Sequence, residues 1–177
     1  MKTTRLITTI AFALMMLLSF NAEAQKFRGL DKSPLDVNYY RTSRNASPDA
    51  RVIYSRPQLK GRTIAALAPN GKVWRTGANE AVEITFYNDT KFGGETIKAG
   101  TYSLFTIPGD KEWTVILNSD LHAWGAYSYN EENDVARFKV SVDKAEDSIE
   151  AFSIAFTKDS LNMGWGTLRL VIPFSKA

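Results

Sequence analysis

The sequence predicts an all-β protein, an antiparallel β-sandwich of the jelly-roll kind with about nine strands. From residue 51 onward, short apolar runs alternate with polar residues at a period of two, and Gly, Pro, Asn or Asp bounds each run. No stretch shows a convincing period of 3.6 residues, which an amphipathic helix would have. A closed β-barrel uses the same kind of strand and is the alternative.

The N-terminus has the three parts of a secretory signal peptide. Lys2 and Arg5 give a basic start, an apolar run follows at residues 6–18, and AEA at residues 22–24 fits the small-residue cleavage pattern. This run is shorter than the roughly 18 apolar residues that a membrane-spanning helix needs. We expect cleavage after Ala24, no membrane span in the mature chain, and a periplasmic or secreted location.

The composition of the remaining chain excludes several classes of protein. Of the 22 basic and 19 acidic residues, 2 and 1 lie in the signal segment, so that 20 and 18 remain. These charges are interspersed, whereas a nucleic-acid partner requires a basic patch. There is no cysteine, which excludes disulfides, so stability must come from a packed core. We expect no nucleic-acid partner and no cofactor.

The mature chain divides into a leader and one domain. Residues 25–50 show little periodicity and end in Ser47-Pro48-Asp49, a turn signal, which indicates an irregular leader. Within it, Tyr39 and Tyr40 are apolar enough to hold part of the leader against the domain. Residues 51–177 form the single β-sandwich domain.

Within the domain, the clearest strand is at residues 82–86, where Val, Ile and Phe alternate with Glu and Thr. Residues 101–107 and 113–118 flank a five-residue connection that contains Pro and Gly, which predicts a hairpin. The other runs are shorter or less regular. In order, the expected strands are 52–55, 63–67, 82–86, 101–107, 113–118, 127–129, 136–142, 152–156 and 168–174.

Few residues offer catalytic or metal chemistry. His122 is the single histidine, and without cysteine the common zinc sites are excluded, so we expect no metal. The acidic group at residues 131–134 lacks the spacing of a calcium loop and is typical of a solvated turn. His122 and Glu80 are weak candidates for a general acid and base.

The densest unusual chemistry lies in GKVWRTGANE, residues 71–80, which follows YSRPQLKGR at residues 54–62. Asn70-Gly71 is a strong tight-turn dipeptide. If the chain reverses there, the turn gathers Arg56, Arg62, Arg75 and Glu80 in one neighbourhood.

Such a cluster has two interpretations. Arginine forks suit carboxylates, phosphates or sugar hydroxyls, and a tryptophan face suits a sugar ring, so a small polar or saccharide ligand fits. Alternatively, the polar groups satisfy the backbone of an irregular crossover while Trp74 fills one end of the core. The candidate ligand-binding residues are Arg56, Arg62, Trp74, Arg75, Asn79, Glu80 and Trp124, with His122 on a second rim.

Three functions remain open from the residues alone. The leading hypothesis is an exported protein that binds a small polar molecule or a saccharide. The second is an envelope hydrolase or isomerase that uses Glu80 and His122. The third is a structural envelope protein without a ligand. The sequence does not indicate an oligomeric state.

Several motifs together resemble one known family. They are YSRPQLKGR (54–62), GKVWRTGANEAVEITF (71–86), AGTYSLFTIPG (99–109), EWTVILN (112–118) and WGAYSYNEENDVARFKV (124–140). Over residues 47–174 the chain resembles DUF2911, a secreted bacterial domain of unknown function. The resemblance implies a periplasmic or secreted single domain and transfers no activity.

Overall fold

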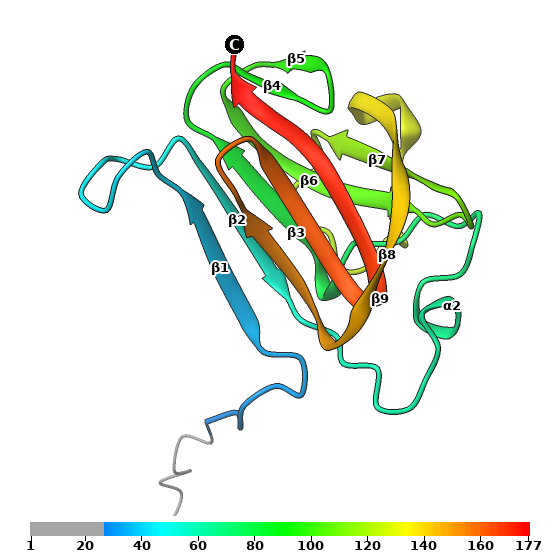
Figure 1. The fold of residues 1–177 in the computed structure, drawn as a ribbon. Helices are drawn as coiled ribbons and strands as arrows, with labels where there is room; N and C mark the ends of the chain where they lie inside the picture. The colour runs from blue at the N-terminus through cyan, green and yellow to red at the C-terminus, as the bar shows by residue number, and fades with distance from the viewer. Residues whose placement is uncertain (1–26) are drawn as a thin grey trace, which may run out of the picture. The chain divides into compact units, whose positions relative to one another are not determined.

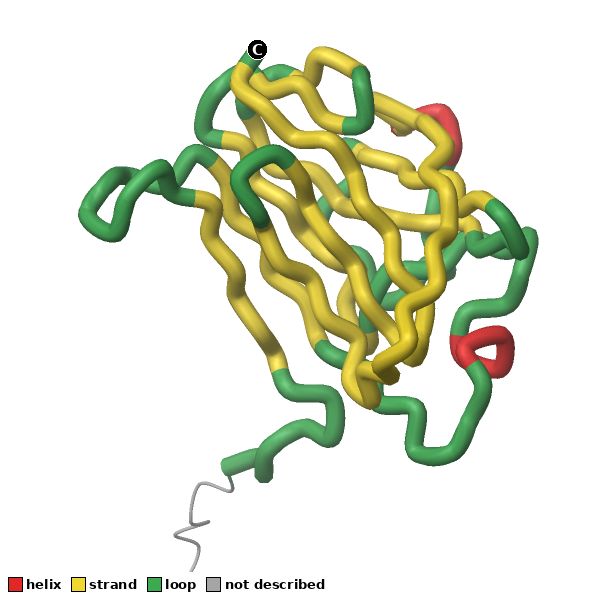
Figure 2. Tube along the Cα trace, viewed as in Figure 1, coloured by secondary structure: helices red, strands yellow, loops and turns green. Residues whose placement is uncertain are grey.

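The chain forms one antiparallel sheet of nine strands in the order β1-β2-β3-β6-β7-β8-β9-β4-β5, in the part that the structure describes, residues 27–177. The structure is a computed structural model. Figures 1 and 2 show the strands with two short helical turns, α2 (Ile64–Leu67) and η1 (Glu131–Asn133). The strands are β1 (Leu35–Tyr40), β2 (Ala50–Ser55), β3 (Ala78–Phe86), β4 (Thr90–Phe92), β5 (Glu95–Ile97), β6 (Gly100–Ile107), β7 (Glu112–Asn118), β8 (Asp134–Phe156) and β9 (Ser160–Lys176).

The predicted signal peptide, residues 1–24, lies outside the described residues. Within the described part, no helix is long and apolar enough to cross a membrane.

The sheet folds over on itself because β8 changes partner along its length. Residues 134–141 of β8 pair with β7, and residues 142–156 pair with β9. The β8–β9 hairpin thereby lies across β2 and β3 (Figure 1), and a bridge between Gln58 and Ala151 joins the two layers. Strands β1 and β5 remain as edges, so the sheet is not closed into a barrel. The predicted sandwich-like, all-β fold is confirmed.

The core lies between the two layers. It takes Val52, Ile84 and Leu104 from the larger layer and Ile154 and Met163 from the hairpin, all of them buried. Burying such side chains removes about 1.5–3 kcal/mol of unfavourable hydration for each one.

Four aromatic residues join the layers at one end of this core. The Trp74 ring stacks on Trp165, with centroids 5.4 Å apart and planes 8° from parallel. It also meets Phe152 edge to face at 5.3 Å and Trp113 at 5.9 Å. Since Trp165 and Phe152 belong to the hairpin and Trp113 to β7, Trp74 contacts both layers.

A second, smaller apolar cluster lies on the outer face of the sheet. Ala81, Phe105 and Ile116 point away from the main core and are buried. The loop that connects β7 to β8, residues 119–133, covers them with Ala123, Ala126 and Tyr129. The loop is therefore packed against β3 and β6.

Two of the predicted strands are wrong. Residues 64–67 form helix α2, because the hydroxyl of the preceding Thr63 caps it by accepting from the Ala66 N–H at 3.2 Å and the alanines favour a helix. Residues 127–129 form part of a turn in the β7–β8 loop, where Tyr129 packs against Phe105 at 5.2 Å.

Other differences concern strands that the pattern missed or divided. Strand β1 lies within the leader that was expected to be irregular, and its side chains are all exposed or half-buried, so it lacks a clear apolar face. Strands β4 and β5 have three residues each, too few for a period to show. Residues 136–142 and 152–156 belong to one strand, β8, whose pairing is irregular between Lys144 and Ser153.

Removing the Trp74 ring should destabilise the whole fold. Trp74→Ala is expected to lower the free energy of unfolding by about 3–5 kcal/mol, because it leaves a cavity between the layers. Denaturant titration followed by circular dichroism measures this change. The matched variant Arg62→Ala, at an exposed residue of the same motif pair, should cost less than about 1 kcal/mol. Similar losses in both variants would contradict the structural role of Trp74.

The buried Tyr54 is expected to make the free energy of unfolding fall as the pH rises above 10. Its hydroxyl donates to Asp36 Oδ2 at 3.1 Å and accepts from the Ile154 N–H at 2.8 Å. Burial raises the pKa of Tyr54 to about 12 from 10.0. The folded state therefore holds the phenol proton more tightly than the unfolded state. This stabilisation is complete below pH 10, and about 2–3 kcal/mol of it is lost between pH 10 and 12.

Tyr54→Phe should flatten this alkaline loss. At pH 7 the substitution should itself cost about 1–3 kcal/mol, because the buried Ile154 N–H loses its hydroxyl acceptor. Urea titrations at pH 7, 10 and 11.5 measure both effects. Tyr87→Phe, at an exposed tyrosine, is the control and should follow the parent curve. An unchanged alkaline slope in Tyr54→Phe would show that Tyr54 does not cause the decline.

Candidate functional site

The motif GKVWRTGANE forms the irregular segment that leads into β3. Trp74 pairs with Thr106 of β6 through two backbone hydrogen bonds, of 2.7 and 2.9 Å. Thr76 is fully buried in a left-handed conformation, with φ of +58°, and its hydroxyl donates to Thr106 Oγ1 at 3.1 Å. A branched residue adopts this φ at a cost, so the surrounding contacts must impose it.

The residues that follow hold the β7–β8 loop in place. The Ala81 N–H donates to the Ala123 carbonyl at 2.8 Å, and the Gly125 N–H donates to the Asn79 carbonyl at 3.0 Å. Glu80 and Trp124 face each other in the antiparallel bridge between these bonds. The motif is therefore the docking strand for the loop, and the docked loop leaves a hollow on each side.

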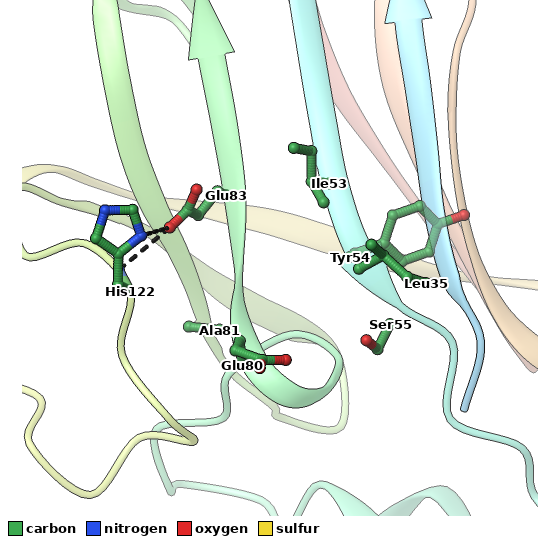
Figure 3. A pocket seen from close by; sticks show the side chains of 8 residues that line it. All are labelled: Leu35, Ile53, Tyr54, Ser55, Glu80, Ala81, Glu83 and His122. Carbon is green, nitrogen blue, oxygen red and sulfur yellow. Dashed lines mark hydrogen bonds and ion pairs between the residues drawn. The ribbon is translucent and has the colours of Figure 1, made fainter. Parts of the chain in front are cut away.

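The first hollow, which we call the His122 pocket, has a volume of about 410 Å³. It lies on the outer face of β2 and β3. Figure 3 shows Glu83 and His122 on one side of it and Ile53 and Leu35 on the other. Its lining residues are Leu35, Ile53, Tyr54, Ser55, Glu80, Ala81, Glu83 and His122.

Glu83 fixes the orientation of His122. One carboxylate oxygen, Glu83 Oε1, lies 2.9 Å from His122 Nδ1 and accepts from the His122 backbone N–H at 3.1 Å. His122 has a left-handed backbone, with φ of +59°. The imidazole is 83% exposed and the Glu83 side chain 22% exposed. Because Nδ1 is engaged, Nε2 is the ring nitrogen left to meet a ligand.

The chemistry of this pocket is rich in hydrogen-bond acceptors. Two carboxylates line it, and no lysine or arginine is among its lining residues. Trp124 is directly opposed to Glu80 in the antiparallel bridge, where paired side chains project to the same side, but it is not among the residues that line this pocket. Trp124 is 59% exposed. Among residues 27–177, no group of three or more His, Cys, Asp or Glu side chains is arranged to hold a metal ion.

The second hollow, the Arg75 pocket, has a volume of about 240 Å³. The Arg75 Nε–H donates to the Gly77 carbonyl at 3.2 Å. The lining residues are Leu67, Pro69, Lys72, Val73, Trp74, Arg75, Ala126 and Tyr127.

The other two predicted arginines lie elsewhere. Arg56 links the layers by donating to the Phe152 carbonyl at 3.0 Å and to Ser153 Oγ at 2.6 Å. Arg62 is exposed and donates to the carbonyls of its own loop, Leu59 at 3.0 Å and Gln58 at 2.8 Å. Neither arginine lines the His122 pocket or the Arg75 pocket.

The tight turn expected at Asn70-Gly71 forms, since the Lys72 N–H donates to the Pro69 carbonyl at 3.3 Å, but Trp74 then pairs with Thr106 of β6 and not with the segment that carries Arg62. The Gly71 N–H donates to the Pro108 carbonyl at 2.9 Å, and Asn70 Nδ2 donates to Asp110 Oδ1 at 2.6 Å. This segment therefore attaches to the β6–β7 turn. The cluster divides, with Arg75 and Trp74 at one pocket, Glu80 at the other, and Asn79 in the backbone of the bridge.

Glu83 is the residue that sequence reasoning missed. As one of the polar positions that alternate with Val82 and Ile84, it has the pattern of a solvated strand face. The one available signal was that His122 is the single histidine, and that it lies in a loop long enough to return to the sheet. Its partner depends on where the loop docks, which the strand pattern does not contain.

Comparison with known proteins gives a family and no function. Neither the curated proteins nor the solved structures include a match to this chain. The family model described as protein of unknown function (DUF2911) matches residues 36–174. The motifs suggested that the resemblance begins at residue 47. The family match begins earlier, at residue 36, and so takes in nearly all of β1. The chain belongs to the DUF2911 family.

Proposed function

We propose that this protein binds a small polyhydroxylated ligand, a saccharide or a saccharide fragment, in the His122 pocket. The observation that carries the proposal is the Glu83–His122 pair, whose imidazole is held at 2.9 Å on the wall of an open pocket of about 410 Å³. That volume is in the range of about 300–1,000 Å³ typical of small-molecule sites.

The types of side chain fit sugar hydroxyls. Carboxylate oxygens of Glu80 and Glu83 accept hydrogen bonds, and Nε2 of His122 provides one more polar contact. Trp124, which is opposed to the pocket residue Glu80 in the bridge, offers an exposed aromatic ring, and such rings combine an apolar face with a polar edge. Leu35 and Ile53 give an apolar wall for the carbon skeleton.

Backbone strain at His122 supports the same site. A non-glycine residue with positive φ costs free energy, and such residues are concentrated at functional positions. Here the left-handed backbone of His122 lets its N–H and its ring both reach the same Glu83 oxygen. A rigid side chain loses little entropy when a ligand binds.

The charge of the pocket restricts the ligand. With two carboxylates and no lysine or arginine among its lining, the pocket disfavours anions. The ligand proposed here is therefore neutral or carries an amine. This narrows the sequence-based hypothesis, which included anionic ligands.

Ligand-observed NMR on residues 25–177 tests the proposal. The probes are methyl glucoside, methyl galactoside, N-acetylglucosamine, glucosamine and cellobiose, at millimolar concentration. We expect at least one of them to bind, and Glu83→Gln and Trp124→Ala to weaken its binding roughly tenfold. Glu95→Gln, at an exposed carboxylate on β5, is the matched control and should bind as the parent does.

Two outcomes would redirect the interpretation. If no probe binds, or if Glu83→Gln and Trp124→Ala bind as the parent does, the saccharide proposal fails and a structural role is favoured. If a glycoside probe is converted in the same samples, the second candidate holds, a hydrolase or isomerase. The observation in its favour is that Glu80 and His122 line one pocket while Glu83 orients the imidazole. Turnover should then be lost in both Glu80→Gln and His122→Gln.

We also propose that the protein is exported from a bacterial cell after cleavage of residues 1–24. The support is the basic start, the apolar run and the AEA site in the sequence. Expressed with its own N-terminus in a Gram-negative host, the chain should appear in the periplasm or the medium, and intact-mass measurement should place its first residue at Gln25. Ala24→Arg should block cleavage. Recovery of uncleaved parent chain from the cytoplasm would contradict export.

A further inference from the structure

We propose that the Arg75 pocket is a separate binding site for a small organic acid, a molecule with a carboxylate group and a compact apolar body. This site lies on the other side of the docked loop from the His122 pocket. The proposal does not depend on the saccharide proposal, because no residue lines both pockets.

The Arg75 pocket carries uncompensated positive charge. Arg75 and Lys72 both line the pocket, and no acidic residue is among its lining. Within residues 27–177, neither side chain takes part in any of the ion pairs that the structure forms. By contrast, Arg137 and Arg169 each contact a carboxylate at 3.2 Å or less. Two cationic side chains that line one pocket without a counterion attract a carboxylate.

The remaining walls of the pocket are apolar. Hydrocarbon or aromatic side chains make up the other six lining residues: Leu67, Pro69, Val73, Trp74, Ala126 and Tyr127. A ligand that is only a charge, such as phosphate, would leave these walls in contact with water. The volume of about 240 Å³ is below the usual range for drug-sized ligands, so the ligand must be small.

Arg75 is held in place before any ligand arrives. Its Nε–H donates to the Gly77 carbonyl, which leaves the terminal nitrogens to meet a ligand. Gly125, with φ of +70°, lets the guanidinium approach closely, since a Cβ there would lie 3.2 Å from Arg75 Nη1. The same Cβ would lie 2.7 Å from the Tyr127 ring. The Arg75 guanidinium and the Tyr127 ring therefore both lie close to the backbone of Gly125.

Titration of residues 25–177 with matched probes tests this site. Benzoate has the proposed carboxylate and apolar body, benzamide is its neutral isostere, and acetate and inorganic phosphate are anions without an apolar body. Calorimetry and the NMR signals of Trp74 and Tyr127 report binding. We expect benzoate to bind at least tenfold more tightly than the other three probes, because it alone satisfies both the cations and the apolar walls.

Variants locate the site and guard against misfolding. Arg75→Gln and Lys72→Ala should each weaken benzoate binding roughly tenfold. Lys72 is exposed, so Lys72→Ala should remain folded even if Arg75→Gln does not. Lys91→Ala, at an exposed lysine on β4, is the matched control and should leave binding unchanged.

Three results would overturn the proposal. The first is benzamide binding as tightly as benzoate, because the cations would then be irrelevant. The second is phosphate binding as tightly, which would indicate a simple anion site without a role for the apolar walls. The third is benzoate binding that Lys72→Ala and Arg75→Gln leave unchanged. Saccharide binding at the His122 pocket should persist in Lys72→Ala, so the two proposals fail separately.

Discussion

The position of Trp74 is the constraint on which the rest of this structure depends. Its ring stacks on Trp165 of the hairpin and meets Trp113 of the larger layer, while its backbone pairs with Thr106 of β6. These three contacts together fix the position of Trp74. Because the chain from Trp74 to the start of β3 is only a few residues long, fixing Trp74 also fixes where Thr76 and Asn79 must lie.

That short segment then determines the outer face of the sheet. Thr76 and Asn79 both have left-handed backbones, which turn the chain so that Asn79 and Ala81 offer a carbonyl and an N–H to the β7–β8 loop. The loop meets these groups with the Ala123 carbonyl, which accepts, and the Gly125 N–H, which donates, and it brings His122 to Glu83. Both pockets are consequences of this docking, since the loop supplies one wall of each. The conformational cost at Thr76 is offset by core burial, and its benefit is a positioned loop.

The sequence pattern predicted the all-β, sandwich-like fold and most of its long strands, because a half-buried strand shows its period directly. Strands β4 and β5 are too short to show it, and β1 is an edge strand without a buried face. At residues 63–67 the cap on Thr63 and the alanines outweighed the strand pattern. The candidate site was predicted in part. Trp74, Arg75, Glu80 and His122 do line pockets, but Glu83 pairs with a residue 39 positions away, and no local pattern contains that contact.

Arginine content alone was a poor guide to where a ligand binds. Arg56 donates to the Phe152 carbonyl and the Ser153 hydroxyl between the layers. Arg62 donates to the Leu59 carbonyl of its own loop. Arg56 also pairs with the Asp36 carboxylate at 3.4 Å, and Arg62 donates to neutral carbonyl oxygens, so the donors of both side chains are already occupied. Arg75 differs because only its Nε is used. The side chain with unused donors beside an apolar wall is the one available to a ligand, and sequence composition does not distinguish it from the others.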